Sequence, residues 1–214
     1  MKDLIIVGAG GLGREVSWLV SRINEVSPQW NLLGFLDNNC EIQSKNIDKV
    51  NVIGMVEDIV NYPEAYVVCC VANTKVRKML AEKVSSNRFA TLIDPAAIMS
   101  SMVEVGEGSV ICAGTVISVD IKIGKHNIVG INSTIGHDAV LEDFVTLYPS
   151  VNVSGNTLIE SGVELGTGTQ VLQGLTIGEN AVVGAGAVVT HDLPGVCTAV
   201  GVPAKVIKIN GEKC

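Results

Sequence analysis

An aliphatic residue returns at every sixth position over the C-terminal half of the chain, and this period restricts the possible folds more than any other feature. Seventeen consecutive positions obey it, from Ile93 to Val189. Moving the frame by one residue gives mostly small or polar side chains, such as Gly124, Gly130 and Gly136, so general apolarity does not explain the pattern. A period of six matches neither the 3.6-residue repeat of a helix nor the alternation of a simple strand.

Four residues after each aliphatic position the side chain is usually small or β-branched, as at Ser109, Ala139 and Ala181. Short strands joined by glycine-containing corners give this register, with one large side chain pointing inward from each strand. Such coils bury their apolar faces only by stacking on one another. The sequence therefore predicts a solenoid over residues 93–191, followed by a closing segment over residues 192–214.

Residues 1–92 have a different organisation, in which a strand, a glycine turn and a helix follow one another. Gly8, Gly10 and Gly13 fit the G-x-G-x-x-G spacing, a turn that brings backbone close to a phosphate at a helix N-terminus. Two further apolar segments end at Asp37 and Asn73, which predicts a Rossmann-like α/β domain. Its three or four expected strands are too few for a full dinucleotide fold. We expect one nucleotide or a nucleotide sugar, with NAD binding and a purely structural turn as alternatives.

Composition and charge exclude several classes of protein. Hydrophobic residues make up 47% of the sequence and aromatic residues only 4%, so thin aliphatic layers must form the core. The net charge is −7, and residues 93–190 hold ten acidic residues against two lysines, which leaves no basic face for nucleic acid. The apolar stretches are too short for a membrane span, so we expect no membrane insertion and a cytoplasmic location. The six cysteines have no CxxC spacing, and we interpret them as reduced thiols.

The repeat pattern [LIV]-G-x-x-[STA]-x resembles that of left-handed parallel β-helix acyltransferases, in which three hexapeptides complete one triangular coil. This resemblance implies five to six coils, with a height of about 25 Å at the usual ~4.8 Å strand spacing. It also implies a homotrimer that binds acyl-CoA between subunits. Gly201, Pro203 and Lys205 fit the G-x-P-A-K turn that closes such domains. Together with the glycine-turn domain, the whole chain resembles the NeuD/PglD-like sugar acyltransferases.

The resemblance to this family implies that the N-terminal domain binds a nucleotide-activated amino sugar. The implied contacts are in the glycine turn and at the ends of the second and third strands: Gly10, Gly11, Leu12, Gly13, Asp37, Asn38, Ala72 and Asn73. The chain departs from the family at Leu12, where one relative has His, and at Ala72, which replaces a glycine. The resemblance therefore leaves the identity of the sugar open.

In the same family a His followed by Asp or Glu supplies the general base and the acid that orients it, which implies these roles for His137 and Asp138. Neighbours on a regular strand point to opposite faces, so the chain must bend beside this pair, and Glu142 is the alternative orienting acid. An Asn that family members often carry seven residues before the catalytic His is replaced by Gly130. The acyl-CoA contacts implied by the family are Thr146, Gly155, Thr167, Ala185 and Lys205.

We therefore expect an acetyltransferase that moves an acetyl group from acetyl-CoA to the amine of a nucleotide-linked amino sugar, in surface-glycan biosynthesis and without a metal. One alternative is O-acetylation of sialic acid or a related sugar. A second is a non-catalytic trimeric scaffold that binds a nucleotide. A third, a zinc carbonic anhydrase, needs three His ligands, whereas the repeat contains only His126 and His137. The remaining histidine, His191, follows the last repeat and resembles an ordinary surface residue.

Overall fold

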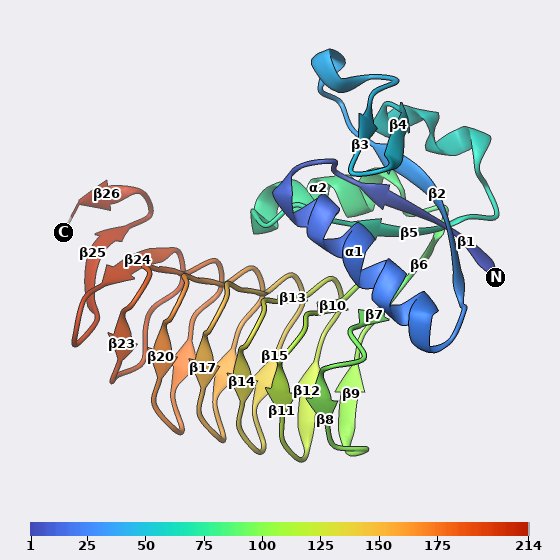
Figure 1. The fold of residues 1–214 in the computed structure, drawn as a ribbon. Helices are drawn as coiled ribbons and strands as arrows, with labels where there is room; N and C mark the ends of the chain where they lie inside the picture. Colours follow the sequence, from blue (N-terminus) through green and yellow to red (C-terminus); the bar gives the residue numbers. More distant parts are fainter. Residues whose placement is uncertain (214) are drawn as a thin grey trace. The chain divides into compact units, whose positions relative to one another are not determined.

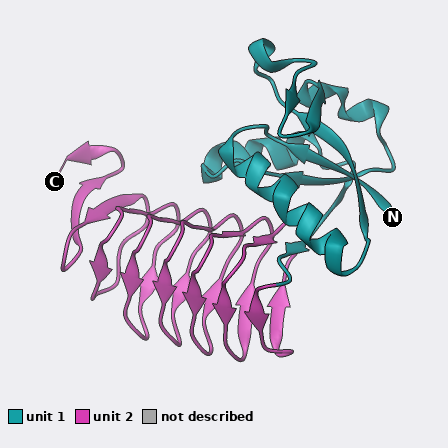
Figure 2. Cartoon of the chain, in the orientation of Figure 1, with its two compact units in different colours: residues 1–95 teal, residues 96–214 magenta. Residues whose placement is uncertain are grey.

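The computed structural model describes residues 1–213, and the chain divides into two compact units, residues 1–95 and residues 96–214 (Figure 2). The division falls close to the point where the six-residue period begins. In the described residues, no helix has the length and apolarity that a membrane crossing requires.

The first unit is a Rossmann-like α/β domain built on a six-stranded sheet with the order β3-β4-β2-β1-β5-β6 (Figure 1). All neighbouring strands are parallel except β3 and β4. The strands are β1 (Lys2–Val7), β2 (Trp30–Leu36), β3 (Asn46–Ile47), β4 (Val50–Gly54), β5 (Tyr66–Cys69) and β6 (Arg88–Phe89), and β7 (Leu92–Ile93) follows them. The helices are α1 (Gly11–Val26), α2 (Thr74–Lys83) and the 3-10 helices η1 (Cys40–Ile42) and η2 (Val56–Asn61). Strands β3 and β6 hold two residues each, too few to leave a pattern in the sequence.

The central strand of this unit, β1, is buried on both faces. Leu4, Ile5, Ile6 and Val7 are each 0% exposed, which explains the continuous apolar run at the start of the chain. The chain passes from β2 on one side of β1 to β5 on the other side. Such a reversal of strand order opens a crevice at the C-terminal ends of the strands, where ligands bind in open α/β sheets.

The second unit is a left-handed parallel β-helix made of three sheets. Sheet 1 contains β10 (Val110–Ile111), β13 (Ile128–Val129), β16 (Thr146–Leu147), β19 (Glu164–Leu165), β22 (Val182–Val183) and β24 (Cys197–Val200). Sheet 2 contains β8 (Ile98–Met99), β11 (Val116–Ile117), β14 (Thr134–Ile135), β17 (Asn152–Val153), β20 (Gln170–Val171) and β23 (Val188–Val189). Sheet 3 contains β9 (Val103–Val105), β12 (Ile121–Ile123), β15 (Val140–Leu141), β18 (Leu158–Ile159) and β21 (Thr176–Ile177). Ile117 pairs with Ile135 and Ile135 with Val153, so three hexapeptides complete each coil.

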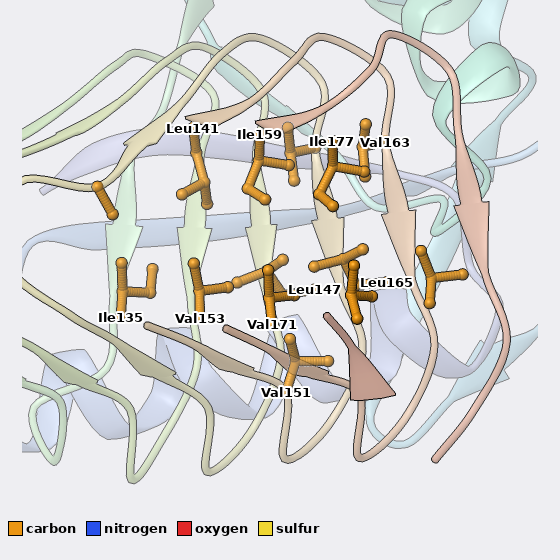
Figure 3. Close-up of a cluster of buried hydrophobic side chains, with 14 of the residues drawn as sticks. Ile135, Leu141, Leu147, Val151, Val153, Ile159, Val163, Leu165, Val171 and Ile177 are labelled. Atoms are coloured by element: carbon orange, nitrogen blue, oxygen red, sulfur yellow. The ribbon is translucent and has the colours of Figure 1, made fainter. Parts of the chain in front are cut away.

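The core of the β-helix is the aliphatic column that the six-residue period predicts (Figure 3). Ile135, Leu141 and Leu147 follow one another around a coil and are 2%, 1% and 0% exposed. The second inward position holds smaller side chains, such as Ala139 and Val145, which are 0% exposed. Burial of each large aliphatic side chain contributes about 2 kcal/mol, and every coil adds three of them. The predicted β-helix is thus confirmed in its register and its core.

Residues with left-handed backbone form the three edges of the β-helix. Edge 1 contains Gly108, His126, Phe144, Gly162 and Asn180, edge 2 contains Gly114, Asn132, Ser150, Gly168 and Gly186, and edge 3 contains Asp120, Asp138, Asn156 and Gly174. Most of these residues are Gly, Asn or Asp, which adopt a positive φ at the least cost. Equivalent positions on one edge are therefore 18 residues apart, as the strand register requires.

The C-terminal segment ends the solenoid with a different structure. Leu193 forms a bridge with Ile177, so the last coil is shorter than the regular register by two residues. After β24, the strands β25 (Lys205–Ile209) and β26 (Glu212–Lys213) continue sheet 1 in antiparallel orientation. An atypical terminal segment of this kind caps a solenoid whose last coil has no further neighbour.

Candidate active site

The side chains of His137 and Asp138 form a hydrogen-bonded pair on edge 3. His137 Nδ1 lies 2.7 Å from Asp138 Oδ2, and the two side chains are 52% and 59% exposed. Asp138 has a φ of 59°, and this left-handed bend brings neighbouring side chains together. The backbone fixes the bend, because the Asp138 N–H donates to the Val119 carbonyl and the His137 carbonyl accepts from Asn156. Since a carboxylate only accepts, Nδ1 carries a proton, and in the neutral ring Nε2 therefore has the lone pair.

Glu142, the alternative orienting acid, is engaged elsewhere. Its Oε2 accepts hydrogen bonds from both the N–H and the hydroxyl of Ser161, each at 2.9 Å. The geometry therefore pairs His137 with Asp138 and leaves Glu142 to hold the next coil.

The imidazole of His137 lies over Gly155, the equivalent position one coil further on. A Cβ on Gly155 would lie 2.6 Å from His137 Nε2 and 2.7 Å from Cε1, closer than van der Waals contact allows. Val119 and Gln173 occupy the same position on neighbouring coils, so the corner itself accepts a side chain. Gly155, expected from the sequence to leave room for pantetheine, thus also leaves room for the imidazole.

The other residues expected along acyl-CoA do not lie beside His137. Thr167 and Ala185 are exposed and precede the left-handed glycines of edge 2. Thr146, in β16, is 1% exposed, and Lys205 is exposed at the start of β25. One chain therefore distributes the expected acyl-CoA contacts over different edges of the β-helix.

The glycines of the first turn have different local roles. Gly8 has a φ of 103°, and a Cβ on Gly13 would collide with the Gly8 carbonyl oxygen, so the fold itself requires these two glycines. An added Cβ on Gly10 or Gly11 would meet no atom within 4 Å. The backbone at the N-terminus of α1 is therefore open to an approaching anion, while Leu12 is half-buried behind it.

Asp37 connects the second strand to the glycine turn. Its Oδ2 accepts a hydrogen bond from the Ala9 N–H at 2.8 Å, and its Oδ1 accepts from the Asn39 N–H at 2.9 Å. The carboxylate thus shapes the loop that a nucleotide would contact, in addition to any contact it makes itself.

The side chains of Asn38 and Asn73 each accept a hydrogen bond from a backbone N–H at the start of a helix. Asn38 Oδ1 accepts from the Val56 N–H at 2.8 Å at the start of η2. Asn73 caps α2, because its Oδ1 accepts from the Val76 N–H at 3.0 Å. The sequence pattern that suggested ligand contacts therefore also reflects helix capping.

A pocket of about 250 Å³ lies at the C-terminal ends of β1 and β2 and the start of α2. It is lined by Val7, Gly8, Leu36, Asp37, Asn38, Val56, Val71, Val76, Met79 and Leu80. Val76 and Met79, which the sequence analysis did not single out, are 39% and 49% exposed. Both are apolar residues of α2 outside its buried face, and this feature could have identified them from the sequence. Mostly apolar walls with a few polar groups are typical of a small-molecule site.

Arg77 was also missed, although it supports this site from below. It is 0% exposed, and its Nη1 donates to the carbonyl oxygens of Val71 and Ala72, each at 2.8 Å. A charged residue in register with the buried Leu80 and Ala81 is the signal that marks it in the sequence. Arg77 therefore holds the loop that follows β5.

A larger hollow of about 700 Å³ lies over α1, β2 and the β3–β4 hairpin, lined in part by Arg14, Trp18 and Asp48. It contains none of the residues implied by the family resemblance. Size alone therefore does not identify the site, and the smaller pocket at the strand ends has the more suitable chemistry.

Cys69 and His126, two further side chains capable of thiol or metal chemistry, are buried. Burial raises the pKa of the Cys69 thiol to about 12, which keeps it protonated and unreactive. His126 is 6% exposed, and its ring stacks on Phe144 with 4.8 Å between ring centroids. Across residues 1–213, no three His, Cys, Asp or Glu side chains converge on a possible metal position.

Comparisons with known families agree with these two units. The family described as the PglD N-terminal domain matches residues 3–84, and the family described as bacterial transferase hexapeptide, with six repeats, matches residues 156–191. An α/β unit followed by a hexapeptide β-helix with an exposed His-acid pair defines a hexapeptide-repeat acyltransferase.

The relationship extends over the whole chain. The acetyltransferase domain of PglB from Neisseria gonorrhoeae is 30% identical, with a TM-score of 0.89, and the match covers 96% of this chain and 100% of that domain. The protein belongs to the NeuD/PglD-type sugar acyltransferases.

Two further relatives show how far the similarity reaches. A perosamine N-acetyltransferase mutant from Caulobacter crescentus, solved with CoA and GDP-perosamine, is 26% identical, with a TM-score of 0.88 and coverage of 96% of this chain and 97% of that chain. The serine acetyltransferase of Synechococcus elongatus is 35% identical over 39% of this chain. The chain spans only 38% of that enzyme's length, so this similarity is partial.

Proposed function

We propose that the protein is an acetyltransferase that transfers the acetyl group of acetyl-CoA to the amine of a nucleotide-linked amino sugar, in surface-glycan biosynthesis. The observation that carries this proposal is the His137–Asp138 pair, exposed on edge 3 with a hydrogen bond of 2.7 Å. A relative that matches this chain over nearly its full length was solved with CoA and a nucleotide-linked amino sugar. Cytoplasmic acetyl-CoA is the natural donor, and we place the protein in the cytoplasm.

His137 acts as the general base. Asp138 accepts the Nδ1 proton and so fixes the tautomer whose Nε2 lone pair is available. As the sugar amine attacks the thioester carbonyl carbon, Nε2 takes one amine proton and a carbon–nitrogen bond forms. When the tetrahedral intermediate collapses, the carbon–sulfur bond breaks and the imidazolium returns the proton to the leaving thiolate. The products are the acetamido sugar and free CoA thiol.

The backbone N–H of Gly155 is the donor we assign to the developing oxyanion. Its neighbours are already engaged, because Ser154 donates to Val171 and Asn156 donates to His137. Among the described residues, no backbone carbonyl accepts a hydrogen bond from the Gly155 N–H. Gly155 also lies against the imidazole ring of His137. An N–H donor fixed in this way stabilises charge as it develops on the carbonyl oxygen.

The acyl-CoA site is composite and lies between copies of the chain. Thr167 and Ala185 lie on edge 2, whereas His137 and Gly155 lie on edge 3. A homotrimer places edge 2 of one copy opposite edge 3 of the next, which completes three sites. Co-expression of His137→Ala with Ala185→Trp chains tests this arrangement. Each variant alone is inactive, but mixed trimers regain activity because some sites contain both intact edges.

The nucleotide sugar binds the first unit at the ends of the parallel strands. The open backbone at Gly10 and Gly11 receives a phosphate, and the pocket of about 250 Å³ beside Asp37 accepts a single base. Leu12 is half-buried in the glycine turn. Ala72 is held in place because its carbonyl oxygen accepts a hydrogen bond from Arg77.

The deciding experiment incubates the protein with acetyl-CoA and a panel of UDP-, dTDP-, GDP- and CMP-linked amino sugars, and measures release of free thiol. We expect turnover with an amino sugar and none with its hydroxyl analogue. His137→Ala should leave only residual turnover while CoA binding, followed by calorimetry, is retained. Acetylation of free sialic acid alone would favour O-acetyl transfer, and absence of acetyl-CoA binding would leave only the scaffold function.

A further inference from the structure

A second His-Asp dipeptide occupies the same edge as the catalytic pair. His191 and Asp192 follow His137 and Asp138 by 54 residues, which is three coils of 18. Val189 pairs with Val171 in the regular register, so His191 stands at the corner of edge 3 on the last coil. The positions between the two histidines on this edge are Gly155 and Gln173.

The two dipeptides differ in their hydrogen bonds. His191 Nδ1 lies 2.9 Å from the Thr190 hydroxyl, and not beside the following aspartate. Asp192 Oδ1 instead accepts from the Thr176 N–H at 2.8 Å and closes the shortened corner. The Thr190 hydroxyl can donate to Nδ1, unlike a carboxylate, and in that tautomer the ring proton lies on Nε2. The exposed His191 is therefore free to present an Nε2 donor, which the carboxylate partner of His137 does not allow in a neutral ring.

The spacing between the histidines matches the length of the pantetheine arm. Three coils at ~4.8 Å per strand separate the two positions by about 14 Å. About 13 bonds join the thioester sulfur of acetyl-CoA to the first phosphorus, and an extended chain of that length covers about 15 Å. A thioester held at His137 thus places the diphosphate near His191.

The charge distribution sets the direction of the arm along this edge. The N-terminal coils of edge 3 carry Asp120 and Asp138, which repel phosphates. Lys205 lies at the other end of the β-helix, next to the last coil, because the Ala204 N–H donates to the Val188 carbonyl at 2.7 Å. The carboxylate of Asp192 also lies at this end, but it is engaged by the Thr176 N–H. Lys205 therefore favours phosphates at the C-terminal end of the β-helix, the end at which His191 lies.

We propose that His191 donates its Nε2 proton to the diphosphate of acetyl-CoA and so holds the thioester at the distance of His137. This inference rests on the proposed function, since it assigns a further contact to the same donor substrate. His191 makes the site select donors that carry a diphosphate.

The test compares three acetyl donors in steady-state kinetics. These are acetyl-CoA, acetyl-dephospho-CoA, which keeps the diphosphate, and acetyl-pantetheine, which lacks it. His191→Ala should raise KM about tenfold for the first two donors, with kcat unchanged, and should leave KM for acetyl-pantetheine unaltered. His191→Gln, whose amide nitrogen replaces Nε2, should restore most of the affinity. Lys208→Ala, which removes a charge from β25, serves as a control without donor selectivity.

Equal changes for all three donors, or no change for any of them, would overturn the assignment of His191 while leaving the proposed function intact. If the unaltered protein releases no thiol from any donor with the whole nucleotide-sugar panel, the proposed function fails. In that event, calorimetry of CoA binding still tests the His191 assignment separately from the proposed function. His191→Ala weakens CoA binding about tenfold only if the diphosphate contact exists.

Discussion

Substitution of Gly155 by Ala should strongly reduce activity without unfolding the protein. The added Cβ would lie 2.6 Å from His137 Nε2, so the ring must move by roughly 0.8 Å to reach van der Waals contact. The imidazole is 52% exposed and has space to yield, so the β-helix itself is not forced apart. A misplacement of about 1 Å costs on the order of 100-fold in rate, or about 2.7 kcal/mol in the activation barrier.

The assay is thiol release at saturating acetyl-CoA and acceptor, together with Tm by circular dichroism. We expect kcat to fall 10- to 100-fold while Tm changes by less than about 2 °C. Gln173→Ala is the matched control, since it alters the same position one coil further on without touching the imidazole. In a His137→Ala background the Gly155→Ala change should have little further effect, because its target is already absent. Full activity of Gly155→Ala, or an equal loss in both backgrounds, would refute the argument.

Other changes probe the pair, the thiols and the core. Asp138→Asn should lower kcat by about 100-fold or more, because the carboxylate that fixes the tautomer is lost, whereas Glu142→Gln should stay within about threefold of the unaltered enzyme in the same assay. Under native conditions iodoacetamide should label the exposed Cys40 and spare the buried Cys69, as peptide mapping will reveal. Ile159→Ala, at a side chain that is 0% exposed, should cost about 3 kcal/mol in urea unfolding; a loss below about 1 kcal/mol would contradict tight packing of the column.

The six-residue period predicted most of the β-helix, because every hexapeptide places one large aliphatic side chain in the core. The aliphatic positions from Ile111 to Val189 lie in the core, as the period predicts. The glycine spacing likewise predicted the first strand, turn and helix. The two-residue strands β3 and β6 escaped prediction, since nothing in so short a segment distinguishes a strand from a loop.

The candidate site was only partly visible in the sequence. The dipeptide His137–Asp138 was identified by resemblance, but alternation along a strand argued against direct contact between neighbours. The left-handed backbone at Asp138 removes that objection. The register of Arg77 with the buried Leu80 and Ala81 was overlooked, and only the structure shows the two carbonyl partners that satisfy its guanidinium.

The sequence by itself determined the periodic part of this protein, because burial of one aliphatic residue per hexapeptide depends only on neighbours that recur at fixed spacing. Tertiary structure decided which side chains meet across coils and between loops. It set the imidazole of His137 over Gly155 and tied Asp37 to the glycine turn through Ala9. The coil period of 18 residues predicts that His137 and Gly155 are neighbours, but only the structure shows the ring lying against the glycine. No repeat relates Ala9 to Asp37, 28 positions apart, because their hydrogen bond depends on how the loops fold together.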